Sequence, residues 1–257
     1  MIRRAIRSLE RQLLYPSHLI AAPPGPPPGL DGEVLHRDLG GEAVEAWFLP
    51  ARAGEGARPL VVFAHGNGEL IDLWVEPLGF YRRWGCHLLL VEYRGYGRSG
   101  GEPCEAALAG DVAHFIDRLR GRPEVSEQLI LHGRSLGGGV VCAAARLRAP
   151  TALVLMSTFR SVTAMARRLR LPGFLVTDTY DNEGFLRGYR GPLLIYHGTA
   201  DSLIPFAHAE ALASAAPQAR LVADEGVDHN ELPRDQAGFV GGLRALLEGA
   251  GVTVVEG

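Results

Sequence analysis

The sequence predicts an α/β protein in which helices cover both faces of a mostly parallel β-sheet. Short apolar runs rich in β-forming residues alternate with longer helical stretches along most of the chain, which is the pattern of this fold class. The chain has 257 residues, of which 47% are apolar and 21% are charged, so it can bury one large core. No internal repeat of about 20 to 50 residues is visible. We therefore expect one large domain with a small extension.

The expected elements follow one another in regular order. The strands are short apolar runs, predicted at 43–49, 59–64, 87–92, 128–132, 151–156, 192–196 and 219–223. The helices are longer stretches, predicted at 73–84, 105–120, 136–148, 205–215 and 234–247. Pro103, Pro150 and Pro192 mark boundaries between elements, because proline lacks a backbone donor and restricts the residue before it.

The first 32 residues are expected to be an extension of the main domain. They contain apolar residues at helical spacing with arginines around them, namely Ile2, Ile6, Leu9 and Leu13. This pattern favours a helix packed on its own domain, and a weak contact with a membrane surface is the alternative. Residues 22–29 then form a stiff, proline-rich connector.

The main domain is expected to span residues 33–257. Within it, the segment 157–191 lies between two predicted strands and contains one Arg-rich helical piece, Ser161 to Leu171, followed by a loop. This segment predicts a short cap rather than a second domain.

The charged residues and cysteines exclude several classes of function. The net charge of −3 gives no basic field for nucleic acid, and all 26 basic residues are arginine, which excludes P-loop and Schiff-base lysines. The cysteines are three scattered residues without a C-x-x-C motif, so neither a disulfide framework nor a thiolate zinc site is indicated. The start of the chain lacks the apolar core of a secretory signal, and no apolar run is long enough to span a membrane. We expect a cytoplasmic protein without a cofactor or a metal.

The candidate nucleophile is Ser135, in the motif Gly133-Arg134-Ser135-Leu136-Gly137. This G-x-S-x-G motif follows a predicted strand and precedes a helix of small residues, which is the setting of a nucleophile elbow. The flanking glycines fit a strained turn in which any side chain two positions away would collide with the adjoining strand or helix. A second match, at Ser99, lies in a glycine-rich loop with no helix directly behind it, so we interpret Ser99 as a structural turn residue.

A serine hydroxyl needs a base to remove its proton and a carboxylate to orient that base. In this type of fold the acid and the base follow the serine at the carboxyl ends of later strands. Asp201 and His229 occupy such positions, each just after a predicted strand. Asp201 could instead cap the next helix, and Asp228 is the rival acid, although its side chain would normally diverge from that of its neighbour His229. The oxyanion hole is predicted from the backbone N–H groups of Asn67 and Leu136.

These motifs together resemble the α/β-hydrolase superfamily. The resemblance covers nearly the whole chain after about residue 33 and is carried by HGNGE at 65–69, VEYRGYGRSGG at 91–101, GRSLGGG at 133–139 and HGTADSLIP at 197–205. The sequence is similar to the short-capped, single-domain branch of this superfamily, which includes esterases and thioesterases that remove palmitate from proteins. The resemblance implies an eight-stranded sheet, with Ser135, Asp201 and His229 as the catalytic triad.

The sequence thus predicts a serine hydrolase that cleaves carboxylic esters or thioesters through an acyl-enzyme intermediate. Its expected partner is a small acyl substrate, and the residues proposed to line an apolar acyl pocket are Leu70, Trp74, Phe159, Met165, Leu203 and Ile204. One alternative is a metal-dependent hydrolase, since His65, His132 and His197 each precede a glycine at the carboxyl end of a strand. The other is a catalytically silent binding protein on the same fold.

Overall fold

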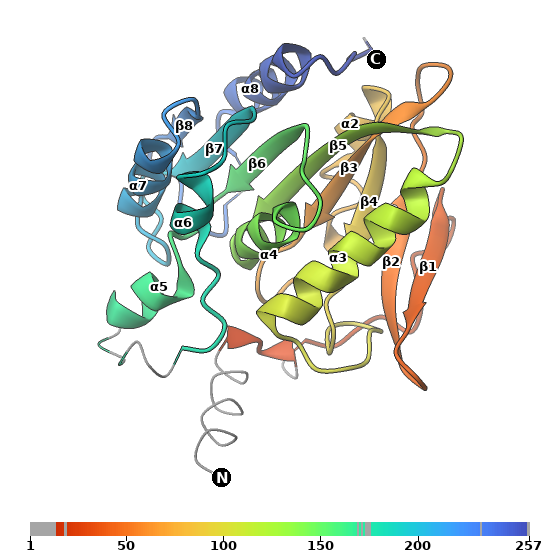
Figure 1. The fold of residues 1–257 in the computed structure, drawn as a ribbon, viewed down its shortest axis with the longest axis horizontal. Coiled ribbons are helices and arrows are strands. Elements are labelled where there is room, and N and C mark those ends of the chain that lie inside the picture. Colours follow the sequence, from red (N-terminus) through yellow and green to blue (C-terminus); the bar gives the residue numbers. More distant parts are fainter. Residues whose placement is uncertain are drawn as a thin grey trace.

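The protein is built around one eight-stranded sheet in the order β1-β2-β4-β3-β5-β6-β7-β8 (Figure 1). The computed structural model describes residues 14–17, 20–168, 170, 172, 176–231 and 233–255. The strands are β1 (Glu33–Asp38), β2 (Ala43–Leu49), β3 (Arg58–Ala64), β4 (His87–Val91), β5 (Val125–Arg134), β6 (Ala152–Met156), β7 (Leu193–Gly198) and β8 (Arg220–Asp224). Strand β2 pairs antiparallel with β1 and with β4, and all other neighbouring strands are parallel. The chain thus has the α/β-hydrolase fold that the sequence predicted.

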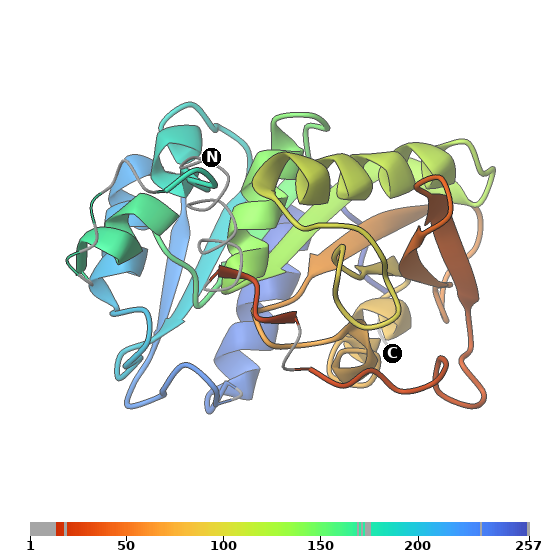
Figure 2. The same ribbon diagram turned by 90° about the horizontal axis from the view of Figure 1, so that it is seen from below.

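Helices cover both faces of this sheet, as Figure 2 shows from below. The helical elements are η2 (Ile71–Leu73), α2 (Gly79–Arg83), α3 (Glu105–Arg120), α4 (Leu136–Ala145), α5 (Val162–Arg168), α6 (Asn182–Leu186), α7 (Ala207–Ala215) and α8 (Gln236–Gly249). Helices α3, α4 and α7 pack on one face, and α2 and α8 pack on the other. None of the helices in the described ranges is long and apolar enough to cross a membrane.

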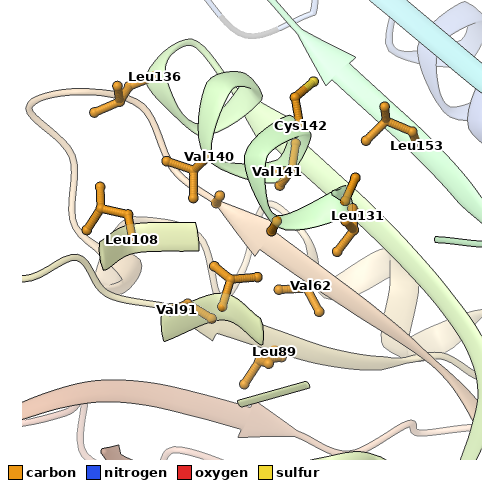
Figure 3. Packing of buried hydrophobic residues seen from close by; sticks show 14 of the residues in the cluster. Val62, Leu89, Val91, Leu108, Leu131, Leu136, Val140, Val141, Cys142 and Leu153 are labelled. Carbon is orange, nitrogen blue, oxygen red and sulfur yellow. The ribbon is translucent and has the colours of Figure 1, made fainter. Parts of the chain in front are cut away.

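The core is divided by the sheet because successive strand residues point to opposite faces. On β3, Val62 belongs to the cluster beneath α3 and α4, whereas Val61 and Phe63 belong to the cluster beneath α2 and α8. Figure 3 shows the first cluster, in which Val140 and Val141 of α4 lie over the central strands. This packing fixes the start of α4, where Ser135 lies, against the middle of the sheet.

The predicted strands are confirmed, with ends that shift by up to three residues. The sheet has the eight strands that the resemblance implied, and β1 is the strand that the apolar runs did not identify individually. Its sequence, EVLHRD, has only two adjacent apolar residues, Val34 and Leu35, and therefore lacks the alternation that identifies a strand. As an edge strand it needs only one apolar side chain in the core, and Leu35 is its one fully buried residue.

Two helix predictions need correction. The helix expected at 73–84 is instead the turn η2 and the short helix α2, because Pro77 cannot donate a hydrogen bond and disfavours a helical conformation at Glu76. The segment between β6 and β7 holds two short helices, α5 and α6, where the sequence indicated one. The helix expected from Ile2, Ile6, Leu9 and Leu13 lies outside the described residues.

Candidate active site

Ser135 lies on a sharp turn between β5 and α4. Its backbone has φ 52° and ψ −117°, a strained conformation for a residue with a side chain, and it occupies the N-cap position of α4. The Ser135 carbonyl accepts hydrogen bonds from Gly138 N and from the Thr158 hydroxyl, and the Ser135 N–H donates to the Met156 carbonyl. Hydrogen bonds to the N–H and to the carbonyl of Ser135 therefore hold its backbone in this strained conformation.

The two glycines of the motif allow this turn to form. A Cβ atom at Gly133 would lie 2.2 Å from the carbonyl oxygen of Gly137, and one at Gly137 would lie 1.9 Å from the carbonyl oxygen of Ala64 in β3. Both distances are far inside van der Waals contact, and both atoms belong to the backbone. The glycine requirement predicted from the sequence is thus confirmed by the packing.

We expect Gly137→Ala to destabilise the protein by about 3 kcal/mol or more, because neither β3 nor α4 can move away without disrupting the sheet. Gly241 provides a matched control. It lies on the exposed face of α8, where an added Cβ would meet nothing within 4 Å. Gly241→Ala should stabilise the helix by about 0.5 to 1 kcal/mol. Urea unfolding of both variants tests this, and equal stabilities would contradict it.

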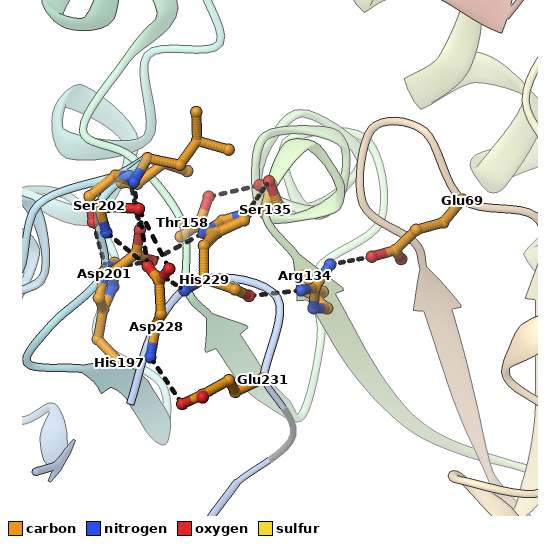
Figure 4. Close-up of polar contacts among 12 residues, drawn as sticks. Glu69, Arg134, Ser135, Thr158, His197, Asp201, Ser202, Asp228, His229 and Glu231 are labelled. Atoms are coloured by element: carbon orange, nitrogen blue, oxygen red, sulfur yellow. Dashed lines mark hydrogen bonds and ion pairs between the residues drawn. The ribbon is translucent and has the colours of Figure 1, made fainter. Parts of the chain in front are cut away.

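Ser135, His229 and Asp201 form one hydrogen-bonded chain, although they come from three separate loops (Figure 4). His229 Nε2 lies 3.1 Å from Ser135 Oγ, and His229 Nδ1 lies 2.7 Å from Asp201 Oδ2. All three residues are buried, with Ser135 7% exposed. Because an ionised carboxylate only accepts hydrogen bonds, Nδ1 carries the proton and Nε2 presents its lone pair to the serine hydroxyl.

Asp201 is held by donors from three sides. His197 Nε2 lies 3.1 Å from Asp201 Oδ2, and the N–H groups of Leu203 and Ile204 donate to Asp201 Oδ1 at 3.0 and 2.7 Å. Burial raises the pKa of Asp201, but the hydrogen bonds from His197, His229 and Ile204 outweigh burial and lower this pKa below its ordinary value. Asp201 is therefore ionised at neutral pH, as an orienting acid must be.

Asp228, the rival acid, has a different set of contacts. Its Oδ1 accepts hydrogen bonds from the Ser202 N–H and hydroxyl and from the His229 N–H, at 2.7 to 2.9 Å. It thus ties the loop that carries Asp201 to the loop that carries His229. In the described structure the imidazole ring bonds to Asp201 and not to Asp228.

The predicted oxyanion residues come from two elements. Leu136 is the first residue of α4, and Asn67 lies in the loop after β3. Among the described residues, no hydrogen-bond acceptor is paired with the backbone N–H of either one. The Asn67 side chain is fixed, since its oxygen accepts from the Tyr96 hydroxyl at 2.6 Å and its Nδ2 donates to the Leu14 carbonyl at 2.9 Å.

The segment before the main domain also reaches this region, which the sequence did not indicate. Leu14 provides the carbonyl that holds Asn67, and the buried Tyr15 hydroxyl contacts both Asp178 and Tyr180 at 2.8 Å. Leu14 and Tyr15 therefore link the loop after β3 to the segment between β6 and β7. The only sequence signal for these contacts was an apolar pair, Leu14-Tyr15, just before a proline.

Several other candidate residues lie apart from this chain. Ser99 occupies a tight turn, where its hydroxyl accepts the N–H of Glu45 at 2.9 Å. His65 contacts Glu92, His132 contacts Tyr81, and His197 contacts the Ile204 carbonyl as well as Asp201. Within the described part of the chain, no group of three His, Cys, Asp or Glu side chains could hold a metal, so the three-histidine site is wrong there.

The six proposed pocket residues do not form one group. Leu70, Phe159 and Ile204 are buried in the cluster that also contains Leu136, and Met165 packs against that cluster. Trp74 belongs to the cluster on the other face of the sheet and lines a separate cavity of about 450 Å³ between α2 and α8. Leu203 is 54% exposed. None of the six lies on a strand, so their positions depend on how the loops and α5 fold over the sheet, which spacing in the sequence does not show.

Sequence reasoning missed four residues that support this site, namely Glu69, Arg134, Thr158 and His197 as an orienting donor. Arg134 is the last residue of β5, and Thr158 lies just after β6. The one visible sequence signal for these residues was the charged residue inside the nucleophile motif. The contacts of Arg134 and Glu69 are drawn in Figure 4. Apart from His197, which lies four positions before Asp201, these residues have partners far away in the sequence, so local patterns could not pair them.

Comparison with known proteins gives a consistent set of similarities. Residues 55–179 match the family described as serine aminopeptidase, S33. The chain is 30% identical over 226 residues to YfhR of Escherichia coli (strain K12), covering 84% of this chain and 79% of that protein. It is 31% identical over 192 residues to alpha/beta hydrolase domain-containing protein 17C of Xenopus tropicalis, covering 70% of this chain and 59% of that protein.

A solved structure shares the fold at lower identity. The propionate-bound thermophilic esterase Est2 from Thermogutta terrifontis superimposes with a TM-score of 0.69 at 19% identity, covering 90% of this chain and 98% of Est2. This likeness concerns the arrangement of the sheet and its helices.

Proposed function

Because the chain belongs to the α/β-hydrolase superfamily, we propose that it is a serine hydrolase that cleaves carboxylic esters with the triad Ser135, His229 and Asp201. The observation that carries the proposal is the continuous hydrogen-bonded chain from Ser135 Oγ through the imidazole to Asp201 Oδ2. It supports nucleophilic catalysis because each member has the partner that its role requires. The proposed thioesterase activity would use the same groups.

In the first half of the reaction, Ser135 Oγ attacks the acyl carbonyl carbon while His229 Nε2 takes the hydroxyl proton. The carbonyl oxygen becomes an oxyanion, which would accept hydrogen bonds from the backbone N–H groups of Leu136 and Asn67. The start of α4 adds positive potential at the same place. Collapse of this intermediate expels the alcohol, which receives the proton from His229, and leaves the acyl group on Ser135.

In the second half, water replaces the alcohol. His229 Nε2 removes a proton from the water molecule as its oxygen attacks the acyl carbon, and the same proton then returns to Ser135 Oγ as the carboxylic acid leaves. Asp201 keeps its negative charge throughout and stabilises the transient imidazolium. The cycle regenerates the free enzyme and needs no further reactant.

The charged groups beside the triad favour an uncharged acyl group over an N-terminal peptide. An aminopeptidase needs a carboxylate that can receive the substrate ammonium. The neighbouring carboxylates Glu69 and Glu231 are already paired with Arg134 and Arg234, and Asp228 accepts hydrogen bonds from Ser202 and from the His229 N–H. A neutral ester does not need such a carboxylate. Est2, which shares the fold, is an esterase whose structure was solved with propionate bound.

Nitrophenyl esters with acyl chains of about two to sixteen carbons provide the direct test, with a matching thioester and an aminoacyl anilide. We expect turnover of short to medium esters, because the α5–α6 segment is short and offers little wall for a long chain. The anilide should react much more slowly. Comparing kcat/KM across the series measures the preference, and preferred cleavage of the anilide would contradict the ester proposal.

A chelator separates this chemistry from the metal alternative. Activity should be unchanged in excess EDTA, since Ser135 is activated by His229 rather than by a metal-bound water. Loss of activity in EDTA and its return with zinc would exclude the serine mechanism.

A further inference from the structure

Arg134, the residue directly before Ser135, holds two loops of the site at once. Its Nη1 pairs with Glu69 Oε1, and its Nη2 donates to the His229 carbonyl oxygen at 2.7 Å (Figure 4). Glu69 in turn accepts the Gly66 N–H at 2.8 Å through its other oxygen. One guanidinium thus connects the loop after β3, which carries Asn67, to the loop that carries the base.

The surroundings of the guanidinium restrict it to this position. Arg134 is 6% exposed, and its charge lies over the Trp74 ring at 5.8 Å. The Trp74 indole N–H donates to Glu69 Oε2 at 3.0 Å, so the carboxylate is fixed from a second side. A planar guanidinium with several donors can satisfy Glu69 and the His229 carbonyl together, which an ammonium cannot do with the same geometry.

Stability alone does not account for this arrangement. Burial lowers the pKa of Arg134, which means that the folded environment disfavours its charge. Buried ion pairs generally add little to stability compared with apolar side chains of similar volume, because both charges lose their hydration. A charge at this position is therefore better explained by the geometry it imposes on its two partners.

We propose that Arg134 is a positioning residue that sets the base His229 and the oxyanion loop relative to Ser135, an inference that rests on the proposed function. Arg134 directly precedes Ser135 in the chain. The nucleophile and the guanidinium that contacts both loops are therefore attached to the same strand end. Its loss would let the imidazole and the Asn67 N–H move independently of Ser135 Oγ. Displacements of about 1 Å at such groups lower rates by about 100-fold.

The test is Arg134→Met, which keeps an unbranched side chain of similar length without the charge. Its readout is the rate of inactivation by a fluorophosphonate, which phosphonylates an activated serine Oγ with loss of fluoride and transfer of the hydroxyl proton to the base. We expect this rate to fall about 100-fold, with kcat for an ester falling equally and KM changing less than about threefold. Arg134→Lys should restore only part of the loss, because an ammonium reaches one partner.

Arg82 provides a matched control in the same chain. It is 4% exposed and, like Arg134, is held by a carboxylate and by backbone carbonyl oxygen, here the Asp31 carboxylate and the carbonyls of Pro50 and Asp31, but it lies in α2. Arg82→Met should lower the melting temperature while leaving the inactivation rate within about twofold. An equal slowing in Arg82→Met and Arg134→Met would overturn the positioning role, as would an unchanged rate in folded Arg134→Met.

A second variant covers the case in which Arg134→Met does not fold. Glu69→Gln retains an acceptor for Gly66 and Trp74 but removes the charge that fixes the guanidinium, so the inactivation rate should fall about tenfold. In this variant an unchanged rate overturns the proposal.

If the wild-type protein does not react with the fluorophosphonate at all, the proposed function itself fails, and this outcome is distinct from an active protein that is insensitive to Arg134.

Discussion

Ser135→Ala should lower kcat for ester hydrolysis by a factor on the order of 10⁶, because it removes the atom that forms the acyl-enzyme. The imidazole and Asp201 remain in place, so the fold and much of the substrate binding should persist. Among the described contacts of the Ser135 side chain, the other direct loss is the hydrogen bond between Ser135 Oγ and His229 Nε2. Steady-state kinetics at neutral pH, with circular dichroism to verify the fold, measure this effect.

Ser99→Ala is the control for this change, since Ser99 has the same flanking glycines. The Ser99 hydroxyl accepts only the N–H of Glu45 among the described groups, so its loss should affect stability by about 1 kcal/mol and leave kcat nearly unchanged. If Ser99→Ala were inactive and folded while Ser135→Ala kept its activity, the nucleophile assignment would be wrong.

Asp201→Asn should lower kcat on the order of 10⁴-fold at pH 7.5 while preserving the fold. The amide keeps the shape of the carboxylate but can offer an N–H to His229 Nδ1, which then places the imidazole proton on Nε2, facing Ser135. The change also removes the charge that would stabilise the imidazolium. Because hydrogen bonds lower the pKa of Asp201 below its ordinary value, the wild-type carboxylate is ionised throughout the neutral range, and the loss should therefore persist across it.

Asp228→Asn is the matched comparison, because Asp228 lies next to His229 and is the other acid that the sequence offers. An asparagine oxygen can still accept from Ser202 and from the His229 N–H, so we expect less than about a tenfold loss. Assaying both variants side by side distinguishes the acids. A greater loss in Asp228→Asn than in Asp201→Asn would refute the role given to Asp201.

The class of fold and the local chemistry of the elbow follow from the sequence alone. Buried parallel strands appear as short continuous apolar runs, and a turn as tight as that at Ser135 needs glycine at positions 133 and 137, so both features are visible over a few residues. The secondary-structure predictions were wrong or incomplete where the local sequence signal is weak. The edge strand β1 buries only Leu35 fully, and the stretch around Pro77 has helical composition but cannot form a continuous helix.

The pairing of side chains that are distant in sequence depends on the tertiary structure. Arg134 contacts His229 and Glu69, which are 95 and 65 positions away, and Thr158 donates to the carbonyl of Ser135, which is 23 positions away. The tertiary structure also placed Trp74 on the opposite face of the sheet from Leu70, although the two are only four residues apart. Such contacts depend on how loops return to the carboxyl ends of the strands, and loop paths are set by long-range packing rather than by the periodicity of any one segment.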